Sequence, residues 1–261
     1  MSMRRQVARS MMIFLSFLLF PVTMFYLSPA IIIEGAFHGV ITGSFIVFGV
    51  LLLTGVIFGR AFCGWLCPGA GLQECCQTVI NKTAKGGKLD KIKYFIWIPW
   101  LSAIIILLIL AGGIHKVNFF YQIPHGISIA EPVAYIIYYF FIGLIVLLAF
   151  LAGRRAFCHY VCWMAPFIII GTKIGKIVRI PQLHLIADKN KCNNCKLCNK
   201  KCQMSLHVEQ MVQQNNMSHT ECILCGECVD GCNRGAIQLT LGTSKTNLLF
   251  DEAQKHDQIK Y

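Results

Sequence analysis

Residues 192–202 read CNNCKLCNKKC, and residues 222–232 read CILCGECVDGC. Both follow the spacing C-x-x-C-x-x-C-x-x-x-C, and together they hold eight of the 14 cysteines in the chain. This spacing is typical of paired [4Fe–4S] clusters, in which the fourth cysteine of each copy binds the other cluster. The predicted ligands are Cys192, Cys195, Cys198 and Cys232 for cluster 1, and Cys222, Cys225, Cys228 and Cys202 for cluster 2.

Other uses of these eight cysteines fit the pattern less well. Structural zinc sites use two pairs of ligands and not a regular triplet plus one. Disulfides need an oxidising compartment and do not favour a duplicated array. Gly226 suits the tight backbone that must close over a cluster. Gln203 and Asn233 stand where bacterial ferredoxins usually have proline, and this difference bears on local rigidity more than on cluster binding.

The composition of the whole chain is that of a membrane protein. Of its 261 residues, 56% are hydrophobic and 14% are charged, and the mean hydropathy is +0.59. The formal net charge is +12. The basic residues lie between apolar segments, as the positive-inside rule describes, and this placement excludes nucleic-acid binding as their explanation.

Four apolar segments are expected to cross a bilayer: 11–27, 40–58, 94–112 and 133–152. The last three contain no Asp, Glu, Lys, Arg or His, which argues against a proton pump or an ion-coupled transporter. The first segment could instead be a signal peptide cleaved near residues 28–30. An uncleaved span is favoured because further spans follow it.

The charges of the loops predict the orientation of the spans. Basic residues gather after the second and fourth segments, whereas the first outer loop has none and the other has only Lys116. Because basic loops stay in the cytoplasm, we expect both termini and the cluster-binding region there. The basic residues are Arg60, Lys82, Lys85, Lys88, Lys91 and Lys93 after the second segment, and Arg154, Arg155, Lys173, Lys176 and Arg179 after the fourth.

The expected fold is therefore a membrane all-α part followed by a small α+β ferredoxin part. Residues 1–180 form the predicted four-helix membrane domain, in two pseudo-repeats. Residues 181–242 form a cytoplasmic 2[4Fe–4S] ferredoxin-like domain with a strand at 236–241, and residues 243–261 form a polar tail. The amphipathic segments 72–80 and 168–180 could lie along the inner headgroup layer.

The two halves of the membrane part carry one motif twice. Residues 60–68 read RAFCGWLCP, and residues 155–163 read RAFCHYVCW. Cysteines four apart face the same way on a helical turn. The four thiols could therefore meet near the inner face, as a third metal centre or as redox dithiols; buried packing is the alternative. These thiols are Cys63, Cys67, Cys158 and Cys162, whereas adjacent Cys75 and Cys76 are expected only to pack.

The C-x-x-x-C-P turn after a span, its partner in the second half and the trailing double-cluster region resemble the NapH-like membrane ferredoxin-type proteins. The resemblance covers about residues 11–241. It implies a protein of the prokaryotic cytoplasmic membrane that passes electrons between a quinol pool, or cytoplasmic donors, and another redox protein. The second motif has Trp163 in place of proline, with Pro166 three residues later, so the two motifs differ in detail.

We therefore expect a membrane-bound iron–sulfur electron carrier, or a subunit of an oxidoreductase complex, and not a stand-alone enzyme. Its expected partners are a soluble ferredoxin or another cytoplasmic redox protein on one side, and a quinone or a membrane redox subunit on the other. The alternative is a metal-centre assembly factor whose membrane-face cysteines reduce or handle an ion such as copper. A scaffold that keeps clusters only for stability is a third interpretation.

Several other polar residues are candidates for a role. A quinol site at the outer face could use Glu34, His38 or His125 as proton acceptor, although a polar rim explains them equally. No span contains a histidine, so a haem between the helices is excluded. His159 could donate to a cluster sulfur, ligate iron or simply lie at headgroup level. The other residues of interest are His115 and Glu131 at the outer side, and Trp65, Trp97, Trp100 and Trp163 as an interfacial belt.

Overall fold

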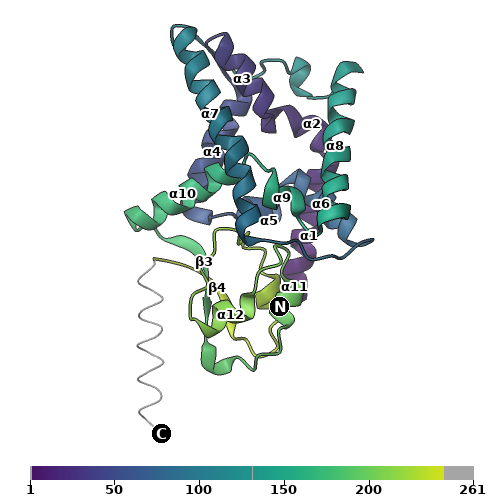
Figure 1. Ribbon diagram of the computed structural model, residues 1–261, viewed down its shortest axis with the longest axis vertical. Helices are drawn as coiled ribbons and strands as arrows, with labels where there is room; N and C mark the ends of the chain where they lie inside the picture. The colour runs from purple at the N-terminus through teal and green to yellow at the C-terminus, as the bar shows by residue number, and fades with distance from the viewer. Residues whose placement is uncertain (1, 131, 244–261) are drawn as a thin grey trace.

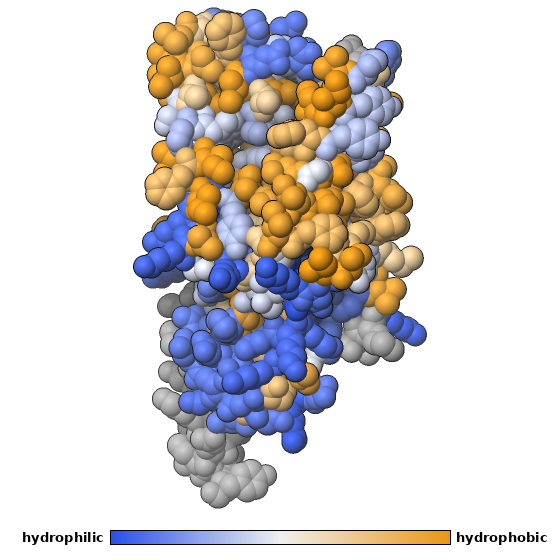
Figure 2. Space-filling model, turned by 45° about the vertical axis from the view of Figure 1, so that its right-hand side comes forward, coloured by the Kyte–Doolittle hydropathy of each residue, from blue (hydrophilic) through white to orange (hydrophobic). Residues whose placement is uncertain are grey.

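A computed structural model describes residues 2–130 and 132–243. A helical part stands above a smaller part that contains the cluster-binding stretches, and the start of α1 (Ser2–Leu18) lies beside the smaller part (Figure 1). The surface of the helical part is mainly apolar, whereas that of the smaller part is mainly polar (Figure 2). This division is the one expected for a membrane part with an attached water-exposed domain.

The helical part contains helices long enough for a bilayer and others that are shorter. Among the described residues, 87–110 and α8 (Pro132–Ala152) are long and apolar enough to span, and α1 with residues 20–27 forms a third candidate bent by 58°. Helix α4 (Gly43–Phe58) has 16 residues. It therefore rises only about 24 Å, less than a typical hydrocarbon core of about 30 Å. Two to three apolar spans are thus supported, and the expected four are not confirmed.

The remaining elements of this part connect and cover these helices. Residues 40–42, which the sequence assigned to the second span, form instead a short parallel pair with β2 (Lys116–Asn118). The other bounds are α2 Phe20–Thr23, η1 Met24–Leu27, α3 Pro29–Phe37, β1 Val40–Thr42, α5 Ala61–Trp65, α6 Pro68–Gln77, η2 Gly87–Lys91, α7 Ile92–Leu110, η3 Pro124–Gly126, α9 Ala156–Tyr160 and α10 Ala165–Val178.

Helix α10 differs from its expected position along the headgroup layer. Its first half packs along α4, where a Cβ on Gly171 would lie 2.1 Å from the carbonyl oxygen of Leu52. Only glycine allows the two backbones to approach so closely. The second half leaves this contact, and Ile177 is 80% exposed. The amphipathic pattern therefore describes only the C-terminal half as a surface segment.

The ferredoxin part is built on one antiparallel strand pair. Strand β3 (Gln182–Ala187) pairs along its whole length with β4 (Ile237–Gly242), from Gln182 opposite Gly242 to Ala187 opposite Ile237. The expected strand at 236–241 is thus displaced by one residue, and the stretch after Pro181 forms its partner. Between the strands lie η4 Lys189–Lys191, α11 Leu197–Lys201, α12 Val208–Gln213 and α13 Glu227–Asp230. Most of the predicted tail lies outside the described residues.

Candidate iron–sulfur sites

The cysteines predicted for cluster 2 line one cavity. Cys202, Cys222, Cys225 and Cys228 all border it, so the fourth cysteine of the first copy lies with the first three of the second. Gly226 has a φ of 76°. This conformation favours glycine and lets the loop turn around the cavity. Burial raises the pKa of the Cys202, Cys222 and Cys225 thiols, each to about 11. The cavity and its four sulfurs fit a [4Fe–4S] cluster, whose iron would provide the charge that holds these sulfurs as thiolates.

Backbone N–H groups point at the fourth cysteine of each copy. The Leu206 nitrogen donates to Cys202 Sγ at 3.4 Å, and the Ala236 nitrogen donates to Cys232 Sγ at 3.4 Å. In both copies the donor comes four residues after the cysteine. Such hydrogen bonds stabilise negative charge on sulfur and are one of the means by which a protein sets a cluster potential.

The two membrane-face motifs adopt the same local backbone. The Cys67 nitrogen donates to the Phe62 carbonyl at 3.0 Å, and the Cys162 nitrogen donates to the Phe157 carbonyl at 2.9 Å. Each motif joins a short helix, α5 or α9, to a longer helix, α6 or α10. The sequence repeat is therefore also a structural repeat at this point of the chain.

The four motif thiols gather in the interior of the protein. Cys63, Cys67, Cys158 and Cys162 are each no more than 5% exposed. Burial, followed by the proximity of Cys158 and Cys63, raises the pKa of Cys162 to about 12. The pKa of Cys67 is raised by burial and by the other three thiols. The expectation that the two halves bring their thiols together is thus met in the structure.

Each motif also buries the arginine that begins it. Arg60 is 3% exposed and Arg155 is fully buried. The Nη1 of Arg155 donates to the Cys63 carbonyl at 2.9 Å, and its Nη2 pairs with Glu74. The Arg60 side chain retains unpartnered Nε and Nη2 atoms, and Arg155 retains an unpartnered Nε. The sequence analysis counted both only as basic residues of inner loops, and that pattern does not predict their burial.

The second cluster loop lies directly on the first membrane-face motif. A Cβ on Gly64 would lie 2.4 Å from the Ile223 carbonyl oxygen and 3.4 Å from the backbone of Cys225. The Trp65 indole Nε1 donates to the Leu224 carbonyl at 3.1 Å, so this tryptophan contacts the cluster loop. The backbone around one predicted cluster ligand thus touches the motif that holds Cys63 and Cys67.

Buried ion pairs join the two parts of the chain at this contact. Arg9 donates to Glu74 Oε1 and to Glu227 Oε1, each at 2.7 Å, and Arg5 pairs with Asp230 at 2.6 Å. Arg9 is 2% exposed. No sequence pattern predicted these pairs, because each joins α1 to residues that are far away along the chain.

A second buried charge network includes the arginine of the first motif. Glu221 accepts from Arg60 Nη1 at 2.8 Å and from Lys93 Nζ at 2.6 Å. Burial alone would raise the pKa of Glu221, but these two cations hold it below its usual range. His159 Nδ1 contacts Asp90 Oδ1 at 2.5 Å, so this histidine is buried in a charge network and does not lie at headgroup level.

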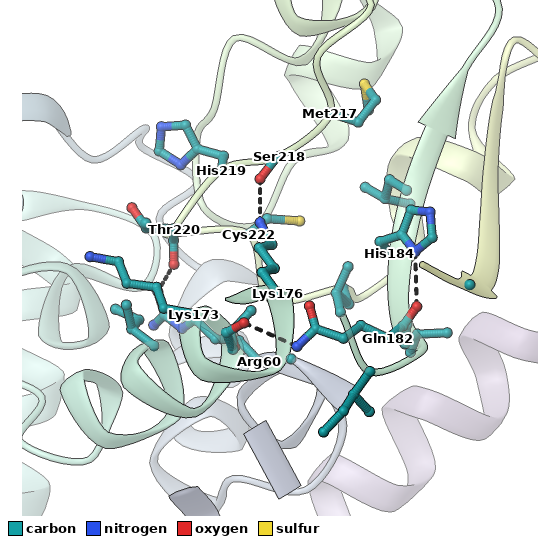
Figure 3. Close-up of a pocket in the computed structure, with 18 of the residues that line it drawn as sticks. Arg60, Lys173, Lys176, Gln182, His184, Met217, Ser218, His219, Thr220 and Cys222 are labelled. Atoms are coloured by element: carbon teal, nitrogen blue, oxygen red, sulfur yellow. Dashed lines mark hydrogen bonds between the residues drawn. The ribbon is translucent and has the colours of Figure 1, made fainter. Parts of the chain in front are cut away.

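A separate pocket lies between α10, β3 and the loop 217–222 (Figure 3). It encloses about 160 Å³ and borders Cys222. Its hydroxyl and amine groups come from the loop and from α10, with Lys176 Nζ donating to Ser218 Oγ at 2.5 Å. The charged residues that line it are all basic, so its electrostatic environment favours anions. These residues are Arg60, Lys173, Lys176 and Arg179.

The outer polar residues show no common site in the described part of the chain. Glu34 accepts from Gln122 Nε2 at 2.8 Å, and His115 Nε2 contacts the Ala111 carbonyl at 2.6 Å. His125 lies in η3 with a φ of 55°. Glu131 is outside the described residues. The interpretation of these residues as a polar rim fits their local bonds.

Comparisons with known proteins agree with these sites. Residues 191–237 match a family described as a 4Fe-4S dicluster domain, and residues 40–84 and 133–181 both match a family described as a 4Fe-4S binding domain. The chain is 24% identical to the ferredoxin-type protein NapH of Haemophilus influenzae over 199 residues, which are 70% of this chain and 63% of NapH. These matches support a NapH-like family of ferredoxin-type proteins for this chain.

Two further proteins are also similar to this chain. An uncharacterized protein of Methanocaldococcus jannaschii is 29% identical over 205 residues, 76% of this chain and 71% of that protein. YccM of Escherichia coli, named as a candidate electron transport protein, is 23% identical over 222 residues, 77% of this chain and 56% of YccM. No solved structure matches the chain. The dicluster match identifies the two predicted cofactors of the NapH-like protein as [4Fe–4S] clusters.

Proposed function

We propose that this protein is a membrane-anchored electron carrier between a cytoplasmic redox protein, such as a ferredoxin, and a quinone pool or a membrane redox subunit. The observation that carries this proposal is the contact between the second cluster loop and the membrane-face motif at Gly64. A soluble ferredoxin needs no such fixed contact with a helical part. The names of the relatives, a ferredoxin-type protein and a candidate electron transport protein, support the same class of function.

The proposed topology has four helices in two pseudo-repeats, with both ends of the chain in the cytoplasm of a prokaryote. The ion pair between Arg5 and Asp230 supports it, because it holds the start of α1 and the ferredoxin part on one side (Figure 1). The short α4 would then cross a bilayer that is locally thinned, or α10 would shield part of α4 from lipid. Basic loops on that same side agree with a cytoplasmic location.

The proposed ligands are the two sets of four cysteines predicted from the spacing. A bound [4Fe–4S] cluster supplies one-electron transfer. The chain provides thiolates and directs backbone N–H groups at Cys202 and Cys232. It also excludes water, since Cys202, Cys225 and Cys228 are all buried. Water exclusion and hydrogen bonding at sulfur are two of the means of tuning a cluster potential.

Paired substitutions test the crossed ligand sets. Cys202→Ser together with Cys228→Ser is expected to remove about four iron atoms per chain, because both belong to one cluster. Cys202→Ser together with Cys198→Ser is expected to remove about eight, because each disrupts a different cluster. Iron and acid-labile sulfide are measured on anaerobically purified protein, with Cys75→Ser as the control. The reverse result, about eight iron atoms lost from the first pair and about four from the second, would contradict the crossed arrangement.

Redox exchange in membranes tests the proposed function. Clusters reduced by ferredoxin should reoxidise when a water-soluble quinone analogue is added, as followed in membrane vesicles by the visible absorbance of the thiolate–iron bonds. Cys228→Ser should lower the amplitude of this signal by about half because one of two clusters is lost. The clusters could instead stay reduced after addition of each quinone tested and of native membranes. That result would show that the protein does not carry electrons between ferredoxin and a membrane acceptor.

A further inference from the structure

The four thiols of the membrane-face motifs form a site outside the two ferredoxin clusters. We propose that Cys63, Cys67, Cys158 and Cys162 together hold a third redox centre, a polynuclear iron–sulfur cluster at the junction of the two half-motifs. This inference rests on the electron-transfer function proposed above and gives it a further component. The charges around the thiols, their spacing and the elements on either side of them support it.

The charges around the thiols fit an anionic centre better than they fit packed neutral cysteines. The arginine three residues before the first cysteine of each motif is buried beside the thiols, and together Arg60 and Arg155 leave three guanidinium nitrogens without a partner. Arg60 shares its carboxylate, Glu221, with the buried Lys93. Buried cations without compensation are costly. An iron–sulfur centre with four thiolates is an anion, and it would compensate them.

The spacing of the thiols fits a centre with more than one metal atom. Ligand sulfurs of a single tetrahedral ion, bound at about 2.3 Å, lie roughly 4 Å from one another. Among the described residues, the one group of three or more metal-ligating atoms within 4.8 Å of each other is Asp90, His159 and Glu221, and no thiol belongs to it. That group is already held by Arg60 and Lys93 through its glutamate. No three of the motif sulfurs therefore lie within 4.8 Å of one another, a wider spacing than the ligands of one tetrahedral ion need.

The surroundings of the thiols resemble those of known cluster sites. Gln73 Nε2 donates to Cys158 Sγ at 3.3 Å. A hydrogen bond of this kind stabilises a cluster ligand. Cys67, Cys158 and Cys162 border a cavity of about 50 Å³ whose other walls are mostly apolar. These walls come from α2, α8 and the neighbouring loops, and they keep water away from the sulfurs.

The position of the site connects the two parts of the molecule. On one side, Gly64, between Cys63 and Cys67, touches the backbone of the second cluster loop. On the other side, the apolar cavity extends from the thiols among the helices of the membrane part. A third centre would therefore stand between the ferredoxin part and the interior of the bilayer. Neither ferredoxin cluster occupies such a place.

Metal analysis of the wild-type protein is the first test, because it needs no variant that must fold. Two [4Fe–4S] clusters account for about eight iron atoms per chain, so a third centre requires at least about two more, with matching acid-labile sulfide. Cys158→Ser is expected to remove only the additional iron and its Mössbauer component. Cys75→Ser is the matched control, since Cys75 is an exposed cysteine on α6 outside the group of four. It should keep all the iron.

Each other result has a definite meaning. About eight iron atoms in wild type, unchanged in Cys158→Ser, would overturn the proposal. Copper in place of the additional iron, lost in Cys158→Ser, would also overturn it and would favour the assembly-factor function. Additional iron in a protein that exchanges no electrons with ferredoxin or quinone would leave the third centre intact and contradict the proposed function instead. The two proposals therefore fail by different measurements.

Discussion

Glu221→Gln is expected to lower the free energy of unfolding by about 3–5 kcal/mol, because the change leaves two buried cations without their shared anion. Arg60 and Lys93 are 3% and 0% exposed, so neither can regain water without disrupting the contact between α7, α5 and the cluster loop. Thermal unfolding in detergent, followed by tryptophan fluorescence, measures the effect. The unfolding midpoint should fall by several degrees or more.

Two further variants separate charge from packing at this position. Lys93→Met leaves Arg60 paired with Glu221 and should cost much less than Glu221→Gln. Lys91→Gln changes an exposed lysine two residues earlier and should have almost no effect. If Glu221→Gln melted at the same temperature as Lys91→Gln, the buried network would not be stabilising the junction.

Gly64→Ala is expected to slow electron exchange between the ferredoxin clusters and the membrane on the order of 100-fold. A displacement of reacting groups by about 1 Å can lower a rate by this factor. The added methyl group would lie 2.4 Å from a backbone oxygen, which cannot rotate away as a side chain could. The cluster loop must therefore move off the motif. Rapid-mixing reduction by ferredoxin, followed by reoxidation with quinone, measures the rate.

A matched glycine on the same segment provides the control. A Cβ on Gly69 would lie 3.6 Å from Ile145 Cδ1, an ordinary contact, so Gly69→Ala should exchange electrons at the wild-type rate. Both variants should retain the iron of the two ferredoxin clusters, because neither position is a ligand. A wild-type rate in Gly64→Ala would show that the contact with Ile223 does not determine the path.

The features that were predictable from the sequence are those carried by local spacing. The cysteine spacing predicted that Cys202 groups with Cys222, Cys225 and Cys228, and these four line one cavity in the structure. The repeat of RAFC predicted that two motifs share one local structure, and their backbone hydrogen bonds agree. In both cases a short, regular spacing carries the information, so tertiary packing does not change it.

Other features depend on partners that are distant in the sequence. The positive-inside pattern counted Arg60 and Arg155 only as loop charges, whereas the structure buries both in ion pairs with Glu221 and Glu74. The apolar segment 40–58 was predicted to be one span, but its first three residues form a strand that pairs with residues 116–118. The arginine that begins each motif repeat was a visible signal of a buried role. Arg9 carried no such signal.

The contacts of α1 also impose an order on how the molecule is made. Arg5, Gln6 and Arg9 bond to Asp230, Cys225 and Glu227, which are synthesised more than 200 residues later. The contact between α1 and residues 225–230 can therefore form only after that stretch has been synthesised. Until then, Arg5 and Arg9 lack these partners.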